Sequence, residues 1–124
     1  MRKMTLALVA VAMSVISGTA FAEGNPAAGA KVFNKCKACH TLKEGGKHKV
    51  GPNLHNIVGR AAGVAEGYRY SKAMAKSGIT WDEATLIAFL EKPRKYLKGT
   101  KMSFAGLKKL ADRENVIAHL KTPQ

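Results

Sequence analysis

The feature that most constrains this chain of 124 residues is the segment Cys36-Lys37-Ala38-Cys39-His40, which holds its only two cysteines. On a helical backbone, cysteines three positions apart lie on one side, within reach of the two vinyl groups of a single haem. The histidine that follows then lies beneath the porphyrin, where an imidazole nitrogen binds the iron. The segment therefore predicts haem c, attached through thioethers to Cys36 and Cys39, with His40 as the proximal ligand.

Three other interpretations of the two cysteines stay open at this stage. A thioredoxin-like redox pair should follow a β-strand in a βαβ pattern, whereas the residues before Cys36 have a helical pattern. A zinc site completed by His48 and His55 is the best of the three, although the spacing of these histidines is outside the usual range. The third alternative is a single structural disulfide. The complete five-residue match favours covalent haem over all of them.

Residues 1–22 have the composition of a secretory signal peptide. A short basic start precedes an apolar run over residues 6–16, and small residues follow as far as Ala22. The alternative is an uncleaved membrane anchor, but an anchor needs about 20 apolar residues to span a bilayer, and this run is too short. We expect cleavage after Ala22, which leaves one domain over 23–124 without a membrane anchor. Export to the periplasm also suits covalent haem attachment.

The predicted mature chain is strongly basic. The full sequence carries 21 Lys and Arg against 8 Asp and Glu, a formal charge of +13, and loss of Arg2 and Lys3 with the leader lowers this to +11. Such a charge implies an acidic partner: nucleic acid, an anionic membrane or an acidic protein face. Export disfavours nucleic acid, and the lysines are spread along the chain rather than gathered in runs. We therefore expect a monomer that docks on acidic faces of other proteins.

The residues after His40 predict a long loop, because six glycines between positions 45 and 67 interrupt any regular pattern. A loop of this length inside a small domain is usually functional, and wrapping a large flat cofactor would explain it. Residues 50–54 can return beneath the haem, where a backbone carbonyl accepts the second imidazole N–H of His40 and raises its basicity. We assign His48 and His55 to surface or loop-bracing roles.

Helices are expected on both sides of this loop. Asn25 followed by Pro26 predicts the start of the first one, with a side-chain cap and a proline at the first helical position. A last helix, roughly over 108–121, is expected to cross the first near Gly29 and Phe33. A glycine inside a helix costs stability relative to alanine, and close packing of a second helix explains its presence.

Two shorter helices are expected between these. Ser71 is the predicted cap of a helix that extends to Ser77. Thr80 is the predicted cap of the next helix, in a capping box with Glu83, and that helix stops before Pro93.

The expected mature chain has two methionines, Met74 and Met102. Met74 lies in a predicted short helix, where methionine usually fills the core. Met102 lies in an irregular segment between Gly99 and Gly106, suited to point a sulfur inwards. A thioether as sixth ligand favours ferrous iron, raises the reduction potential and closes the iron to oxygen and peroxide. Met102 thus separates an electron carrier from a haem peroxidase or a gas-binding haem protein, which need an open iron site.

From about residue 25 to residue 120 the sequence resembles class I cytochrome c, most of all the bacterial cytochrome c2 group and its mitochondrial relatives. The attachment motif alone occurs in many haem proteins, but a joint set of motifs is far more specific. The set consists of Gly51-Pro52-Asn53-Leu54, Gly78-Ile79-Thr80-Trp81, Pro93 and Gly99-Thr100-Lys101-Met102-x-Phe104-Ala105-Gly106. The resemblance implies the all-α cytochrome c fold, in which the first and last helices cross and helices and Ω-loops wrap around one covalent haem c.

The resemblance also implies roles for individual residues. Cys36 and Cys39 would hold haem c, His40 and Met102 would be the axial iron ligands, and the carbonyl of Pro52 would accept from His40. The positions that match the surroundings of the haem propionates are Arg60, Tyr70, Trp81 and Thr100. The residue types alone leave open whether the Trp81 indole donates to a propionate or is only a core ring.

The function that follows is a soluble periplasmic one-electron carrier, not an enzyme. It would carry electrons between membrane redox complexes, for example from a cytochrome bc1-type complex to a photosynthetic reaction centre or a terminal oxidase. By resemblance, a basic rim would dock on these partners: Lys35, Lys49, Arg94, Lys95, Lys101, Lys108 and Lys109. A zinc-stabilised binding module is the structural rival.

Three positions depart from the family pattern. Met74 and Phe89 stand where relatives commonly have an asparagine and a tyrosine near the methionine ligand, and His119 replaces a common tyrosine on the last helix. Because neither Met74 nor Phe89 offers a strong hydrogen-bond donor, a drier pocket is predicted on the methionine side.

Overall fold

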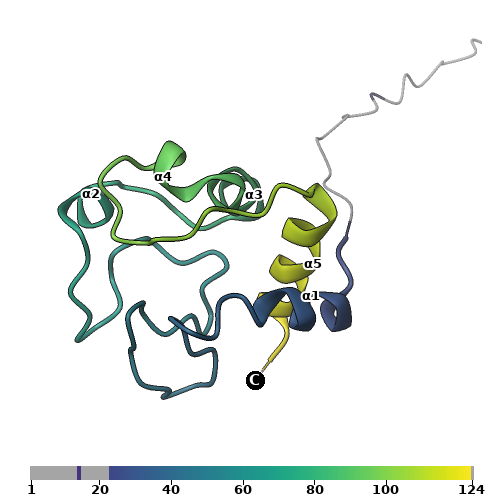
Figure 1. Cartoon of the computed structure of the whole chain (residues 1–124), viewed down its shortest axis with the longest axis horizontal. Helices are drawn as coiled ribbons and strands as arrows, with labels where there is room; N and C mark the ends of the chain where they lie inside the picture. The colour runs from purple at the N-terminus through teal and green to yellow at the C-terminus, as the bar shows by residue number, and fades with distance from the viewer. Residues whose placement is uncertain (1–13, 15–22, 124) are drawn as a thin grey trace, which may run out of the picture.

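Five helices joined by long loops make up the described part of the computed structural model, which covers residue 14 and residues 23–123 (Figure 1). The predicted leader, residues 1–22, lies outside the described residues apart from Ser14. The helices are α1 (Pro26–Phe33), α2 (Lys72–Ala75), α3 (Glu83–Glu91), α4 (Pro93–Tyr96) and α5 (Leu110–Lys121). Within the described part the β-structure is limited to an isolated bridge between Ala61 and Thr80. The all-α prediction is therefore confirmed.

Helix α1 begins as its sequence predicts. The side chain of Asn25 accepts a hydrogen bond from the backbone N–H of Ala28 at 3.1 Å, and Pro26 occupies the first turn, where its missing N–H has no cost. The helix leads directly into a further turn that carries the two cysteines, so its position determines theirs.

Helices α1 and α5 cross in close contact at one end of the molecule (Figure 1). A Cβ atom built on Gly29 would lie 1.8 Å from the backbone oxygen of Asn115, so only glycine permits this approach. The backbone N–H of Asn25 donates to Oδ1 of the same Asn115 at 2.8 Å, and the rings of Phe33 and His119 are 5.4 Å apart. The predicted crossing near Gly29 and Phe33 is confirmed.

The two middle helices differ in detail from the prediction. Ser71 caps α2, accepting from the backbone N–H of Met74 at 3.1 Å, but α2 ends at Ala75 rather than at Ser77. The hydroxyl of Ser77 instead donates to the carbonyl of Met74, which closes the last turn.

Helix α3 is capped by Asp82, and the prediction that Thr80 caps it is wrong. The Asp82 carboxylate accepts from the backbone N–H of Thr85 at 2.8 Å, and this bond lowers the pKa of the carboxyl group. Thr80 instead forms the isolated β-bridge with Ala61. The helix ends before Pro93, as predicted, but that proline also starts the short helix α4, which the sequence did not indicate.

Helix α5 begins two residues later than the predicted start and ends where predicted. Val116, Ile117 and Leu120 are buried on it and join the core with residues of α3. None of the helices in the described part of the chain is long and apolar enough to cross a membrane.

The contact at Gly29 gives a test of the fold. Glycine-to-alanine changes inside helices usually stabilise, by up to about 1 kcal/mol. Gly29→Ala should instead lower the free energy of unfolding by about 1–3 kcal/mol, because the added methyl would collide with the backbone of α5. Chemical denaturation measures the change. Ala27→Gly, at an exposed position of the same helix, reports helix propensity alone. A Gly29→Ala protein as stable as wild type would mean that α1 and α5 are not in this contact.

Candidate functional site

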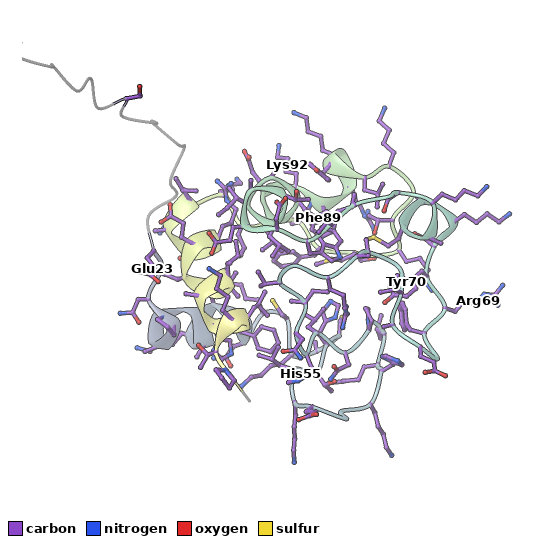
Figure 2. All side chains as sticks on the ribbon, turned by 180° about the vertical axis from the view of Figure 1, so that it is seen from behind. Glu23, His55, Arg69, Tyr70, Phe89 and Lys92 are labelled. Atoms are coloured by element: carbon purple, nitrogen blue, oxygen red, sulfur yellow. The ribbon has the colours of Figure 1, made fainter. Side chains whose placement is uncertain are left out.

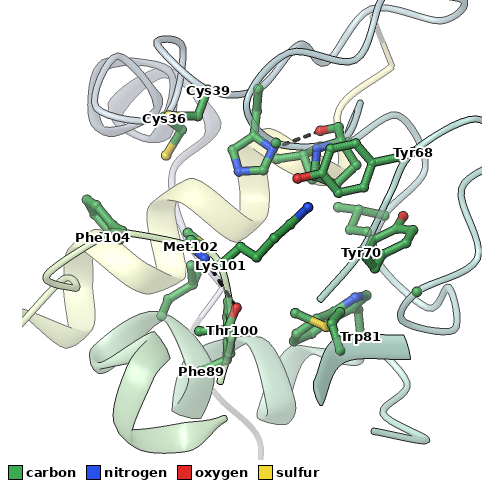
Figure 3. A pocket seen from close by; sticks show the side chains of 18 of the residues that line it. Cys36, Cys39, Tyr68, Tyr70, Trp81, Phe89, Thr100, Lys101, Met102 and Phe104 are labelled. Atoms are coloured by element: carbon green, nitrogen blue, oxygen red, sulfur yellow. Dashed lines mark hydrogen bonds between the residues drawn. The ribbon is translucent and has the colours of Figure 1, made fainter. Parts of the chain in front are cut away.

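The candidate site is a cavity lined by segments far apart in the sequence (Figure 3). One wall comes from the turn after α1 and the loop around Gly51, and another from the Tyr68–Tyr70 region with α2. The remaining walls come from α3 and from residues 99–109, which we call the Met102 strap. Of the site residues predicted from the sequence, those that line the cavity are Lys35, Cys36, Cys39, His40, Pro52, Arg60, Tyr70, Trp81, Thr100, Lys101 and Met102.

The two cysteines lie on consecutive turns of one short helical segment. The backbone N–H of Cys36 donates to the carbonyl of Phe33 at 2.8 Å, and those of Cys39 and His40 donate to the carbonyl of Cys36 at 3.1 and 2.9 Å. Both thiols are free, and burial raises the pKa of Cys36. The geometry therefore presents both sulfur atoms to the same cavity.

The zinc alternative finds no support in the described residues. Nε2 of His48 is 2.7 Å from the carbonyl of Glu66, and its Nδ1 accepts from the backbone N–H of Asn53 at 3.0 Å. Both ring nitrogens are thus used to brace the loop, as predicted for this histidine. Across residues 23–123 no group of three or more His, Cys, Asp or Glu side chains is arranged to hold a metal ion.

His40 is held by a hydrogen bond and by the shape of the loop. Its Nδ1 is 2.8 Å from the carbonyl oxygen of Pro52, and because a carbonyl can only accept, Nδ1 carries the proton. This tautomer leaves the lone pair on Nε2. A Cβ atom on Gly51 would lie 2.3 Å from Cε1 of His40, so the glycine makes room for the ring. Burial lowers the pKa of His40 and favours the neutral imidazole that binds metals.

Met102 lines the same cavity from a different part of the chain. The strap that carries it turns at Gly99 and Gly106, both with positive φ, and the backbone N–H of Met102 is 3.4 Å from Oγ1 of Thr100. Met74 also lines the cavity, from α2, and packs against the edge of the core. Met74 therefore packs on the core, as expected for a methionine in a helix, and also contributes to the cavity wall.

Arg60 supplies an unpaired buried donor at the cavity wall. Its two terminal nitrogens donate to the carbonyls of His55 and Asn53, at 3.0 and 3.4 Å. Its Nε is buried without a hydrogen-bond partner. A buried donor of this kind is costly, and an anionic group of a cofactor in the cavity would satisfy it. Together with two thiols, an imidazole and a thioether, this donor fits a haem with its propionates.

Tyr68 is a cavity residue that the sequence reasoning missed. Its hydroxyl donates to the carbonyl of Val50 at 2.6 Å, and the Lys101 ammonium lies 5.0 Å from its ring centroid. Burial raises the pKa of this tyrosine. The residue thus joins the loop below His40 to the strap that carries Met102. An aromatic residue among glycines was the only signal of this role in the sequence.

The methionine side of the cavity is apolar at the two positions where the family pattern is broken. Phe89 is 4% exposed, and its ring packs 4.8 Å from Trp81 and 6.0 Å from Tyr96. Phe89 stands where the family pattern has a tyrosine, so this position offers no hydroxyl to the cavity. Met74 lines the same cavity with a thioether. His119, the third departure, packs on Phe33 away from the cavity, and burial lowers its pKa.

The predicted docking residues are all exposed. Figure 2 shows basic side chains projecting outwards around the molecule, with Arg69 and Lys92 among those labelled. Three of the predicted set also make contacts of their own. Lys49 donates to the carbonyl of Lys37 at 2.7 Å, Lys101 donates to the carbonyl of Arg69, and Arg94 donates to the Ser103 hydroxyl at 3.0 Å.

Comparison with known proteins identifies the family. The sequence matches the family described as cytochrome c over residues 26–124. The chain belongs to the cytochrome c family. It is 50% identical over 117 residues to cytochrome c-554 of Methylosinus trichosporium, a match that covers 94% of this chain and 88% of that protein. It is 48% identical over 122 residues to cytochrome c2 of Rhodomicrobium vannielii, covering 98% and 97%.

A solved structure agrees with this family assignment. Cytochrome cH from Methylobacterium extorquens superposes with a TM-score of 0.75 at 46% identity, over 79% of this chain and 98% of that one. The class I cytochrome c fold is thereby confirmed. Because this family binds one covalent haem c, and Cys36 and Cys39 provide the two thiols, haem c is the cofactor. The chain is accordingly an electron carrier.

The contact between Gly51 and His40 gives a test of the cytochrome site. Gly51→Ala should displace the imidazole and weaken its bond to Pro52, which lowers the basicity of the ring and raises the reduction potential. Stability should fall by about 1–3 kcal/mol through overpacking. Potentiometry and denaturation measure both effects. Val50→Ala, next to it and 76% exposed, is the control. Identical potentials for Gly51→Ala and wild type would contradict this account of the loop.

Proposed function

We propose that this cytochrome is a soluble periplasmic one-electron carrier of the cytochrome c2 type, in which His40 and Met102 are the axial ligands. The observation that carries the proposal is that Nε2 of His40, left with its lone pair by the bond to Pro52, and the Met102 thioether belong to the same cavity. Haem c bound there supplies an iron that cycles between ferrous and ferric states.

The other residues of the cavity hold and shield the cofactor. Cys36 and Cys39 form the thioether bonds. Arg60 offers its unpaired Nε to a propionate, and Tyr70, Trp81 and Thr100 complete that end of the cavity. If His40 and Met102 both bind the iron, no position would remain for peroxide or oxygen, which argues against an enzyme. The burial of Phe89 and Trp81, neither of which is exposed by more than 6%, supports the proposed drier pocket on the methionine side.

Two observations support export: the composition of residues 1–22, and a match to one relative that covers almost the whole chain. The match to cytochrome c2 of Rhodomicrobium vannielii covers 98% of this chain, so it extends into the leader. We infer cleavage after Ala22 and a mature domain over 23–124 that works in the periplasm without a membrane anchor.

The partners that we propose are acidic faces of membrane redox complexes. The protein would dock on these faces as a monomer. The donor would be a cytochrome bc1-type complex, and the acceptor a photosynthetic reaction centre or a terminal oxidase. The formal charge of the full sequence is +13, or +11 without Arg2 and Lys3 of the proposed leader, and this charge and the exposure of the seven predicted docking residues support the proposal. Such encounters are brief, because turnover requires the partners to separate.

The ligand assignment predicts the effect of removing the thioether. Met102→Ala should keep the haem attached but open the iron. The potential should then fall by on the order of 0.1 V or more, since axial ligands set haem potentials over about 0.8 V. The far-red sulfur–iron band of the ferric protein should disappear, and cyanide should bind faster. Met74→Ala is the control, because it removes the other thioether of the cavity. A far-red band that survives Met102→Ala would exclude Met102 as the ligand.

The basic rim predicts the salt dependence of electron transfer. Between roughly 0.01 and 0.2 M salt, the second-order rate with native membranes should fall about tenfold or more, because screening weakens long-range attraction. Charge reversal at Lys35, Lys95 or Lys109 should slow the reaction more than reversal at Lys121. Since Lys121 pairs with Glu83, its variant also needs a stability check. Rates that do not change with salt would refute docking through the rim.

A further inference from the structure

Arg113, on α5, is a buried charge that the proposed function does not use. It is 8% exposed and is the buried charged side chain of the described core. Burying an ion costs several kcal/mol unless its partners compensate for the lost water. The contacts of the guanidinium group therefore indicate the role of Arg113 in the fold.

The guanidinium group joins two segments that are distant in sequence. Nη1 donates to the carbonyl of Ile87 at 2.9 Å, in the second half of α3, and Nη2 donates to the carbonyl of Lys108 at 3.3 Å, in the strap just before α5. Nη1 is also 3.7 Å from Oε2 of Glu91, on the last turn of α3. A cation at the C-terminal end of a helix is favourable, because the unpaired carbonyls there carry partial negative charge.

The neighbouring residues of the strap fasten the same end of α3. The backbone N–H of Leu107 donates to the carbonyl of Leu90 at 2.8 Å, and the Leu107 side chain is 3% exposed. A Cβ atom on Gly106 would lie 1.9 Å from the carbonyl oxygen of Glu91, so the two backbones are in direct contact. The carbonyl of Leu90, one of the last in α3, thus finds its partner in the strap rather than in the residues that follow the helix.

Met102 lies between this attachment and a second one. On its other side the Lys101 ammonium donates to the carbonyl of Arg69, while the bond from the Thr100 N–H to the Leu97 carbonyl at 3.2 Å closes only a local turn. The exposed Arg94 side chain, on α4, donates to the Ser103 hydroxyl next to Met102. The free stretch of the strap is short as long as both ends are attached. Releasing the end near Leu107 would lengthen it and lower the free energy needed for local opening.

We propose that Arg113 is a positioning residue for Met102: it ties the strap to the end of α3 and so keeps the thioether in the cavity. The proposal rests on the proposed role of Met102 as an iron ligand. Arg113 touches neither the cavity nor the reacting iron and acts through the backbone of the strap.

The test follows the rate at which imidazole replaces the thioether in the ferric holoprotein, measured by loss of the far-red band at saturating imidazole. Arg113→Met keeps the aliphatic length and removes the donors. We expect its replacement rate to rise about tenfold, a factor equivalent to about 1.4 kcal/mol of easier opening. Arg113→Lys, which keeps the charge but not two separate donor nitrogens, should be intermediate.

Two controls separate positioning from general loss of stability. Phe33→Leu weakens the α1–α5 contact, away from the strap, and its loss in unfolding free energy is compared with that of the Arg113 variants. It should change the imidazole rate less than about twofold. Hydrogen exchange gives a local readout. The Leu107 amide should exchange faster in Arg113→Met, while the Trp81 amide, bonded to the carbonyl of Arg60 at 2.9 Å, should be unaffected.

Each outcome decides one proposal. A wild-type ferric protein without the far-red band would overturn the role of Met102 and with it this inference. A normal wild-type band, with Arg113→Met no faster than Phe33→Leu, would overturn the inference alone. If Arg113→Met does not fold, Arg113→Lys decides: faster replacement with faster Leu107 exchange supports the positioning role, and wild-type values for both refute it.

Discussion

The contact between α1 and α5 at Gly29 is the constraint on which both sides of the haem site depend. Gly29 lets the backbones meet at Asn115, and Asn115 in turn holds the backbone of Asn25. Helix α1 leads straight into the turn of Cys36, Cys39 and His40, so the crossing places the attachment side. Helix α5 carries Arg113, which holds the strap of Met102 against α3. One helix crossing thereby relates two segments more than sixty residues apart in sequence.

The segments that carry the two proposed ligands are stabilised by different physical means. His40 is held locally, by the bond from Nδ1 to Pro52 and by the absence of a side chain at Gly51. Met102 belongs to an irregular strap that contributes few side chains to the core and depends on contacts at its ends. A segment of this kind opens more easily than a packed helix. The methionine side is therefore where the protein needs additional attachments, and there the two terminal nitrogens of the buried Arg113 guanidinium bind backbone carbonyls while its Nε has no partner.

Packing replaces hydrogen bonding in the part of the cavity that departs from the family pattern. Phe89 is nearly fully buried between Trp81 and Tyr96, and Met74 adds a second apolar group. Elsewhere in the cavity lining, Tyr68 and Arg60 make polar contacts with the loop backbone. The cavity thus combines an apolar region near the proposed thioether ligand with donors suited to carboxylates. This division suits a haem, whose apolar ring would lie against the first region and whose propionates would accept from the donors.

The sequence by itself determined the cofactor, the family and most of the helices, because these depend on local chemistry. Two cysteines and a histidine at fixed spacing admit little besides haem c, and Asn25 with Pro26 defines a helix start from adjacent residues. The cap of α3 and the existence of α4 were not predictable in the same way. Thr80 could cap α3 or pair with another segment, and its bridge to Ala61 decided for pairing. Pro93 could end α3 or also start a new helix, and packing of the chain decided for the second. Only the tertiary structure brought Tyr68 between the two loops and buried Arg113 under the strap, since these contacts join residues that no spacing relates.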